Sequence, residues 1–599
     1  MDERKNIKEI MFSDKERIIL LCLTLLLLII NIRHVGSIEI FTVLDDEFGY
    51  WGNAAYLAGL DWSGVVSEIP YYSYGYSILL VPLFFIFENP MHMYKAAIFL
   101  NGIMLSASFL LCYDIAGKLA KGIDKRIFMG VAFLISMYPA YIAYSSFAWS
   151  ECLLIFNVWL LTWCFTDLNG TSSNYKFGLV GFFSMYSYIV HQRALGVLLA
   201  SIIVIVAMKL LGKINLKQVI LVAIPIIILG FIHVYLKDNI QTHLWLNSTG
   251  HMTNDYLDQA SKISQILSVD GLLGLTKTFL GHIFYIGAAS YLIGYFGLVE
   301  LLRKSGRALI TTIRNRKIDM LGCDRYFSLY TFLLIAVIFS LSINIVFMIN
   351  PSRMDHIVYG RYIDMIMGPL VLLGFVALMD KKADWNKAFV IISIGFILLA
   401  AAVHWVIETS GLTSFHTIHA VGLLLINSPL SVALPTLTAI VVGRLIIISF
   451  TQKASKMMII SSVIVPFCFF MTGDIVARTA VVNQTAAEII GIVEFIENID
   501  ENSAVYFLWD DQGNPAYGQW DNRNTRNRLI ADSYQFLLKD IPVKLVNKKG
   551  LEGIDDMKFL LTPDKKFLPD LRMNYEMCMD NRYTYLLVSK KTVLPMDKT

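Results

Sequence analysis

The chain is 599 residues long and far more apolar than a soluble protein of that size requires. Hydrophobic residues make up 56% of it, charged residues make up 16%, and the mean hydropathy is +0.59. This composition excludes an ordinary soluble globular protein and predicts an α-helical polytopic membrane protein. The net charge of +3 does not argue for nucleic-acid binding, because basic residues beside membrane spans are expected for orientation. The seven cysteines show neither the paired spacing of a zinc site nor a disulfide framework.

Thirteen apolar segments predict membrane spans, since a span needs about 20 largely apolar residues. They lie near residues 18–34, 93–113, 127–147, 149–166, 176–191, 194–212, 217–236, 278–301, 326–348, 362–379, 388–407, 430–450 and 457–474. The first is expected to be an uncleaved span, because no small-residue cleavage site follows it. If the N-terminus is cytoplasmic, Lys and Arg gather in the alternate loops that would face the cytoplasm, as that orientation requires.

Thirteen spans from a cytoplasmic start place the C-terminal end outside the cytoplasm. The predicted membrane domain is therefore 1–474, with a long first outer loop at 35–92, and the predicted extracytoplasmic domain is 475–599. In the second domain, Thr485 and Glu488 have the spacing of a helix-capping box. Four strand-like runs follow, at 504–509, 543–546, 558–562 and 583–589, with a helix-like run at 528–540 between the first two. This segment is predicted to be a soluble α/β domain.

Three consecutive carboxylates, Asp45, Asp46 and Glu47, open the first outer loop. The residues after them have the spacing of a helix lying at the membrane surface, and Asp46 shares one face of it with Tyr50 and Asn53. One interpretation is that the acidic residues only cap this helix in solvent. The other is that they carry chemistry.

The segment "DEFGYWGNAAYLAG" resembles the Asp-Glu, Tyr, Ala, Gly pattern in the first extracytoplasmic loop of GT-C fold membrane glycosyltransferases. That superfamily includes the protein O-mannosyltransferases and the lipid A aminoarabinose transferases. The next run, "YYSYGYSILLVPLFFIF", resembles the family's second surface helix, with Tyr74 and Gly75 where a Pro-Gly pair is common. The resemblance implies transfer of a sugar from a polyprenyl-phosphate donor to an acceptor outside the cytoplasm.

A phosphate leaving group is already a stable anion, so this reaction needs one general base, whereas a glycosidase needs two carboxyl groups. The resemblance implies that Asp46 is that base, with Asp45 in reserve and Glu47 in an orienting or metal-contacting role. Attack at the anomeric carbon would invert its configuration. The residues predicted to line the substrate cavity are Tyr50, Asn53, Glu151 and Tyr74.

A phosphate also requires cations near the outer membrane face, ideally arginines that make paired hydrogen bonds. The predicted donor-phosphate residues come from "NPSRMDHIVYGRYIDMIMGPL", from "YIVHQRALG" and from the start of the second span: Arg361, Arg353, His356, Arg193, Lys95 and Tyr362. Any one of them could instead anchor the end of a span among lipid headgroups. As a group they favour a functional role, because outer positive charge opposes the orientation bias.

No cofactor is expected to be required. His416 and His419 have i, i+3 spacing and are weak candidates for a divalent metal, although polar residues at a membrane surface are the commoner interpretation. The predicted partners are a polyprenyl-phosphate sugar donor, a glycan, lipid or protein acceptor, and membrane lipids, with no nucleic acid. Ile-rich apolar runs and the lack of a targeting peptide favour a bacterial plasma membrane.

Two other functions fit a chain with many spans. A lipid or glycan transporter or flippase would have internal repeats and ionisable residues near the centre of the membrane. The sequence has no visible internal repeat, and most of its predicted spans lack central charges. A membrane sensor or assembly scaffold would keep its function in an Asp46→Asn variant, whereas a transferase would lose activity.

Overall fold

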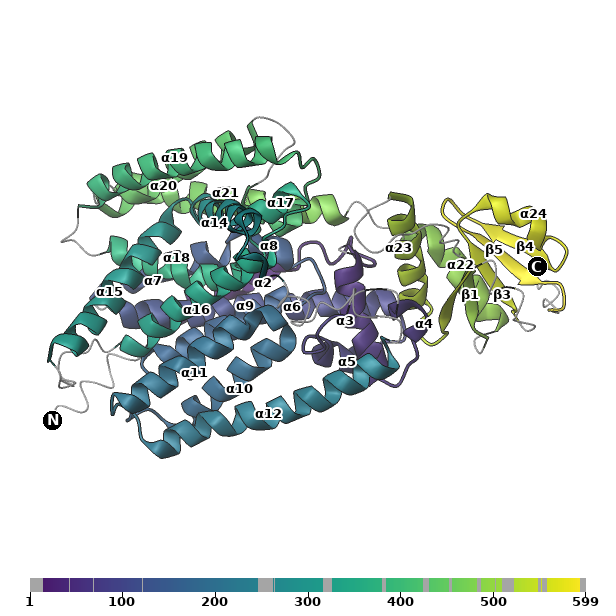
Figure 1. The fold of residues 1–599 in the computed structure, drawn as a ribbon, viewed down its shortest axis with the longest axis horizontal. Coiled ribbons are helices and arrows are strands. Elements are labelled where there is room, and N and C mark those ends of the chain that lie inside the picture. The colour runs from purple at the N-terminus through teal and green to yellow at the C-terminus, as the bar shows by residue number, and fades with distance from the viewer. Residues whose placement is uncertain are drawn as a thin grey trace.

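The protein is a bundle of helices with a small α/β module at one end (Figure 1). The structure, a computed structural model, describes residues 14–42, 44–67, 69, 71–120, 122–245, 262, 264–315, 326–379, 384–423, 430–451, 455–481, 486–500, 503–508, 522–547, 551 and 557–592. The predicted fold class, a helical polytopic membrane protein with a C-terminal α/β domain, is confirmed.

The bundle is built from long apolar helices. They are α2 (Asp14–Asn31), α6 (Pro90–Leu119), α7 (Lys125–Ser136), α9 (Glu151–Thr166), α10 (Asn174–Val190), α11 (Leu195–Leu210), α12 (Leu216–His243), α14 (Val269–Ala289), α15 (Ile293–Asn315), α16 (Phe327–Phe347), α18 (Asp364–Leu378), α19 (Trp385–Ser410), α20 (Leu430–Thr451) and α21 (Ser455–Val481). Among the described residues, eight helices are long and apolar enough to cross a membrane, and three shorter apolar helices accompany them. The count of thirteen spans stays a prediction.

Two of the predicted continuous spans are broken in the structure. The segment 127–147 ends its first helix at Ser136, and a short helix, α8 (Pro139–Tyr144), begins at a proline, which disfavours helical backbone in the residue before it. The segment 278–301 divides into α14 and α15 because Tyr291 and Leu292 take left-handed backbone angles, with φ of 50° and 67°. Neither glycine nor proline marks that second break, so a hydropathy pattern does not detect it.

The first outer loop folds into three short helices between the bundle and the module (Figure 1). They are α3 (Leu44–Leu57), α4 (Ser63–Val66) and α5 (Ser77–Ile86). Two glycines of α3 allow close packing inside the protein: a Cβ on Gly49 would lie 2.2 Å from the Tyr72 ring, and one on Gly52 would lie 2.5 Å from Val66. The space beside both glycines is therefore filled by the protein's own side chains.

The C-terminal module is a five-stranded mixed sheet with helices. Its elements are α22 (Ala486–Ile499), β1 (Val505–Leu508), α23 (Asn522–Leu537), β2 (Val543–Val546), β3 (Phe559–Thr562), α24 (Leu568–Leu571), β4 (Tyr575–Asp580) and β5 (Tyr585–Ser589), with strand order β2-β1-β3-β5-β4. Strand β1 is parallel to β2 and β3, whereas β5 is antiparallel to β3 and β4. The four predicted strands and the predicted helix at 528–540 are present. The edge strand β4 was not predicted, because its half-exposed residues lack a clear apolar alternation. The predicted cap at Thr485 lies outside the described residues.

Candidate active site

An ion pair joins the first turn of α3 to the segment that precedes α18. The Asp46 carboxylate accepts a hydrogen bond from Arg361 Nη1, and its other oxygen accepts one from the Tyr72 hydroxyl at 2.5 Å. Arg361 is almost fully buried, while the Asp46 side chain keeps 22% of its surface exposed. The structure therefore places the predicted base against a predicted phosphate-binding arginine.

A second carboxylate, Glu151 at the first residue of α9, holds two arginines on one oxygen. Its Oε1 accepts hydrogen bonds from Arg361 Nε at 2.5 Å and from Arg193 Nη2 at 2.8 Å. The Glu151 side chain is only 2% exposed. The Tyr50 hydroxyl donates a hydrogen bond at 2.8 Å to the Oγ of Ser150, the residue before Glu151. Asp46, Glu151, Arg193 and Arg361 thus form one network, buried except for part of Asp46, which is called the paired-arginine cluster below.

Arg193 brings unused hydrogen-bond donors into the paired-arginine cluster. It lies in the short turn between α10 and α11, and its side chain is 3% exposed. Its Nε and Nη1 have no hydrogen-bond partner within the described part of the chain, and its guanidinium lies 5.0 Å from the Tyr362 ring centre. Buried charged donors without partners are costly, so this arrangement fits a site that receives an anion.

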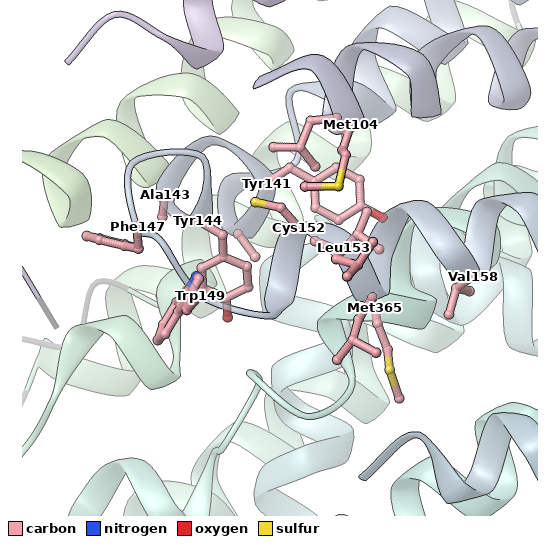
Figure 2. Close-up of a cluster of buried hydrophobic side chains, with 14 of the residues drawn as sticks. Met104, Tyr141, Ala143, Tyr144, Phe147, Trp149, Cys152, Leu153, Val158 and Met365 are labelled. Atoms are coloured by element: carbon pink, nitrogen blue, oxygen red, sulfur yellow. The ribbon is translucent and has the colours of Figure 1, made fainter. Parts of the chain in front are cut away.

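Aromatic side chains hold Arg361 in place. Its guanidinium carbon lies 4.0 Å from the centre of the Trp149 ring, a contact that favours a partly desolvated cation. Trp149 is itself packed edge-on against Tyr144 and Phe147. Figure 2 shows these three rings gathered around the loop that joins α8 to α9. The loop therefore presents a rigid aromatic surface to the arginine.

Charge complementarity outweighs burial at Asp46. Burial alone would raise the pKa of this carboxyl, but the Arg361 charge, followed by the Tyr72 hydrogen bond, lowers the pKa below its ordinary value. At Arg361, burial opposes the charged form, but the Asp46 and Glu151 charges outweigh it and raise the pKa of the guanidinium above its ordinary value. Both groups are therefore charged at neutral pH.

Arg353, Asp355, His356 and Tyr359 of the 349–361 loop form a second group, together with Tyr362 and His419. Arg353 Nη2 pairs with Asp355 at 2.9 Å, and the Tyr359 ring lies between those of His356, His419 and Tyr362, at 5.9, 5.1 and 5.1 Å. Burial, followed by the Arg353 charge, lowers the pKa of His356 to about 4, so this histidine is neutral at neutral pH. In this group only Arg353 has a fixed positive charge, and Asp355 neutralises it.

Three of the predicted residues, Glu47, Asn53 and Tyr74, have partners elsewhere in the protein. Glu47 is fully buried and accepts hydrogen bonds from the Thr42 and Ala148 backbones and from Tyr94. Asn53 bridges the Tyr72 carbonyl and the Trp245 indole, at 2.8 and 2.9 Å.

The Tyr74 hydroxyl oxygen lies 3.2 Å from His233 Nδ1. Lys95 is half-buried in α6, and no hydrogen bond or ion pair joins it to the paired-arginine cluster in the described ranges. The side chain of Asp45 lies outside the described residues.

No group of three or more His, Cys, Asp or Glu side chains could hold a metal ion among the residues described. His416 and His419 have ring centres 6.0 Å apart, and the His416 backbone N–H donates to Asp355 at 3.1 Å.

Sequence reasoning missed two residues of the site, Tyr72 and Trp149. Tyr72 stands in the run "YYSYGY", where nothing local distinguishes it from its neighbours. Trp149 stands two positions before Glu151, and nothing in the local sequence marks it as a partner of an arginine. Both act across elements that are distant in sequence, so only their tertiary contacts identify them.

Comparisons with known proteins give structural likenesses only. No protein-family model matches the chain, and no curated protein matches it. Among solved structures, it is similar to ArnT from Cupriavidus metallidurans bound to undecaprenyl phosphate, with 9% identity, coverage of 98% of this chain and 100% of that chain, and a TM-score of 0.48. It is also similar to the archaeal oligosaccharyltransferase AglB from Archaeoglobus fulgidus in complex with an inhibitory peptide and a dolichol-phosphate. That match has 10% identity, covers 98% of this chain and 76% of that chain, and has a TM-score of 0.42.

Proposed function

We propose that this protein transfers a sugar from a polyprenyl-phosphate donor to an acceptor hydroxyl at the extracytoplasmic face of the membrane. The observation that carries the proposal is the paired-arginine cluster, in which one buried carboxylate holds two arginines beside a second carboxylate. Two donor atoms of Arg193 are unpaired there, within the described part of the chain. The proposal also rests on the resemblance of the Asp46 segment to the GT-C pattern.

The two arginines suit the donor's phosphate. The cluster contains two carboxylates and two guanidinium groups, so its formal charge is balanced before a ligand binds. Arg193 Nε and Nη1 offer N–H groups to phosphate oxygens, and such charge-assisted bonds are strong in a site that excludes water. Glu151 keeps both arginines oriented, which lowers the reorganisation needed as charge develops on the leaving phosphate.

Asp46 suits the role of general base. Its carboxylate is ionised, 22% of the side chain is exposed, and it lies beside the arginine that would hold the leaving group. A bound phosphate competes with Asp46 for Arg361, and Asp46 becomes a stronger proton acceptor when that arginine moves towards the phosphate. In this mechanism the acceptor oxygen loses its proton to Asp46 and attacks the anomeric carbon. The phosphate leaves from the opposite face, which inverts the configuration.

A binding experiment tests the phosphate site. Purified protein in nanodiscs is titrated with a long-chain polyprenyl phosphate and with the corresponding neutral polyprenol. We expect the phosphate to bind more tightly, and we expect Arg193→Gln to weaken its binding by about tenfold or more. Arg444→Gln is the matched control, because Arg444 pairs with Asn386 in a different part of the bundle. Equal binding of phosphate and polyprenol to the wild-type protein would contradict the proposal.

A turnover experiment tests the base. Native membranes are supplied with a panel of polyprenyl-phosphate sugars, and release of free polyprenyl phosphate is measured. Asp46→Asn keeps the shape of the side chain but cannot accept the proton, so we expect about 10²- to 10⁴-fold slower release with retained phosphate binding. Asp61→Asn is the control, because that exposed carboxylate accepts hydrogen bonds only from Ser63, at the start of α4, among the described contacts. Full activity in Asp46→Asn would rule out this base, whereas no release by the wild-type protein would favour a transporter or scaffold.

A further inference from the structure

An aromatic residue of the C-terminal module is inserted between rings of the membrane part of the chain. Phe536, in the last turn of α23, is fully buried. Its ring centre lies 4.7 Å from that of Phe41, 5.1 Å from that of Trp51 and 6.3 Å from those of Trp62 and Tyr94. All four partners belong to the first outer loop or to the start of α6, so Phe536 joins two parts of the chain.

The rings around Phe536 also border the buried Glu47 carboxylate. The Tyr94 hydroxyl donates to Glu47, and the backbone N–H of Thr42, next to Phe41 in sequence, donates to it at 2.8 Å. The Ala148 backbone N–H adds a third hydrogen bond at 2.6 Å. A buried carboxylate with several donors is held firmly, because losing any of them leaves the charge poorly compensated.

Glu47 links the two halves of the proposed active site. On one side it is the residue next to Asp46 in α3. On the other side its partner Ala148 precedes Trp149, the residue against which Arg361 lies. A shift of Glu47 would therefore move the Asp46 carboxylate and Arg361 relative to each other.

Close contacts around Phe536 show that the module packs directly against the outer loop. The Trp62 indole donates to the Lys539 carbonyl at 2.9 Å, and Lys539 Nζ donates to the Phe87 carbonyl at 3.4 Å. A Cβ on Gly64 would lie 2.4 Å from the Val543 carbonyl oxygen, so α4 approaches β2 as closely as a glycine allows. Figure 1 shows α23 next to α3 and α4.

We propose that Phe536 is a positioning residue for the Asp46–Arg361 pair, acting through Tyr94 and Glu47, so that the seated C-terminal module is a condition for a competent site. This inference rests on the proposed function for its catalytic meaning, but the geometry it asserts is measurable without any substrate. It assigns the module a role in building the site itself.

A cysteine introduced at position 46 reports on the pair without a donor or an acceptor. The groups that face this position are Arg361, Tyr72 and Arg193, and the Arg361 charge favours a thiolate. The Asp46→Cys protein is alkylated across a pH series, and the alkylation rate of the introduced thiol is followed by peptide mass spectrometry. The pH at which the alkylation rate is half-maximal is the midpoint. Adding Arg361→Gln to Asp46→Cys should raise this midpoint by roughly one to three pH units. Adding Phe536→Ala to Asp46→Cys should raise the midpoint by at least about half as much as Arg361→Gln does.

The matched control is Phe567→Ala. Phe567 is also buried in the module, but it packs in a separate core formed with Leu508, Met557, Leu560 and Leu587. We expect the midpoint of the introduced thiol to stay at its original value when Phe567→Ala is added. Phe536→Leu, which keeps most of the apolar volume, should give an intermediate shift. An unchanged midpoint with Phe536→Ala, or an equal shift with Phe567→Ala, would overturn the inference.

The two proposals can fail separately. If wild-type protein does not distinguish polyprenyl phosphate from polyprenol, the proposed function fails, while the alkylation midpoints at position 46 still decide the role of Phe536. If the phosphate binds and is released by turnover, Phe536→Ala should lower kcat by about tenfold or more with a KM for the donor within about threefold of wild type. Loss of donor binding with unchanged kcat would contradict the positioning role.

Discussion

Tyr72 and Arg361 together keep Asp46 ionised, and each contributes a different interaction. The arginine supplies an opposite charge, and the tyrosine hydroxyl donates to the second carboxylate oxygen at 2.5 Å. A hydrogen bond to the charged form of an acid lowers its pKa. The folded-state pKa of Asp46 is therefore below its ordinary value.

This lowered pKa has a defined consequence for stability. Because the folded value lies below the unfolded value of about 4, the pairing stabilises the fold fully above that pH. The contribution is lost as the pH falls through the folded value. Near neutral pH the stability should not vary on account of Asp46.

Tyr72→Phe tests the hydrogen bond alone. Removing the hydroxyl should raise the pKa of Asp46 by about one to two pH units, since a hydrogen bond to a charged group is worth about 1.5–3 kcal/mol. We expect the acid limb of the kcat/KM profile to move to higher pH, as measured by release of polyprenyl phosphate.

Tyr74→Phe serves as the control for Tyr72→Phe. Tyr74 lies in the same loop as Tyr72, but its hydroxyl contacts His233 of α12. An unchanged limb in Tyr72→Phe, or the same movement in Tyr74→Phe, would count against this role.

At the scale of elements, the site depends on how closely α3 packs on the segment that follows α4. The approach is possible because Gly49 has no side chain where the Tyr72 ring lies. The same face of α3 presents Asp46 and Tyr50, which reach Arg361 and Ser150. The helix thus positions the base and receives the tyrosine that orients it.

Gly49→Ala should disturb this packing. The added Cβ would lie 2.2 Å from Tyr72 Cδ2 and 2.7 Å from Cγ, so the ring must move and its hydrogen bond to Asp46 must lengthen. We expect activity to fall on the order of 10- to 100-fold, because small displacements at a reacting centre are costly.

The control for that variant is Gly130→Ala in α7, where nothing lies within 4 Å of the added Cβ. We expect it to keep full activity and to be slightly more stable, since alanine is favoured over glycine inside helices. Normal turnover in Gly49→Ala would mean that the Tyr72 ring is not required at its present position.

At the scale of the whole molecule, the proposed site and the module lie towards one end of the bundle, and the N-terminal starts of α2 and α7 lie at the other (Figure 1). Lys125 Nζ and Glu16 Oε2, at 3.5 Å, bring the starts of these two helices together. We propose that the module end is extracytoplasmic, as a donor site on the outer leaflet requires.

Sidedness can be measured with single cysteines and a membrane-impermeant maleimide. Asp570 is exposed in the module and Arg126 is exposed at the start of α7. In intact cells we expect Asp570→Cys to be labelled and Arg126→Cys to be labelled only after permeabilisation, with peptides resolved by mass spectrometry. The opposite pattern would reverse the proposed orientation and move the site to the cytoplasmic face.

Properties that depend on local composition and spacing could be predicted from the amino-acid sequence. Long apolar runs specified a membrane bundle, because lipid imposes a length and an apolar character on every span. Periodicity specified the helix that begins at Leu44, and short β-rich runs specified four of the five strands of the module. Each of these features is encoded in a contiguous stretch of chain.

Contacts between the polar candidates could not be predicted in this way, because they depend on the folding of distant segments against each other. Asp46 and Arg361 are 315 positions apart, and Glu151 lies between two arginines that no spacing rule could bring together. The break between α14 and α15 follows from left-handed angles at Tyr291 and Leu292, which no local residue preference predicts. These choices belong to the whole molecule, because a buried charge is tolerated only where the complete fold supplies its partners.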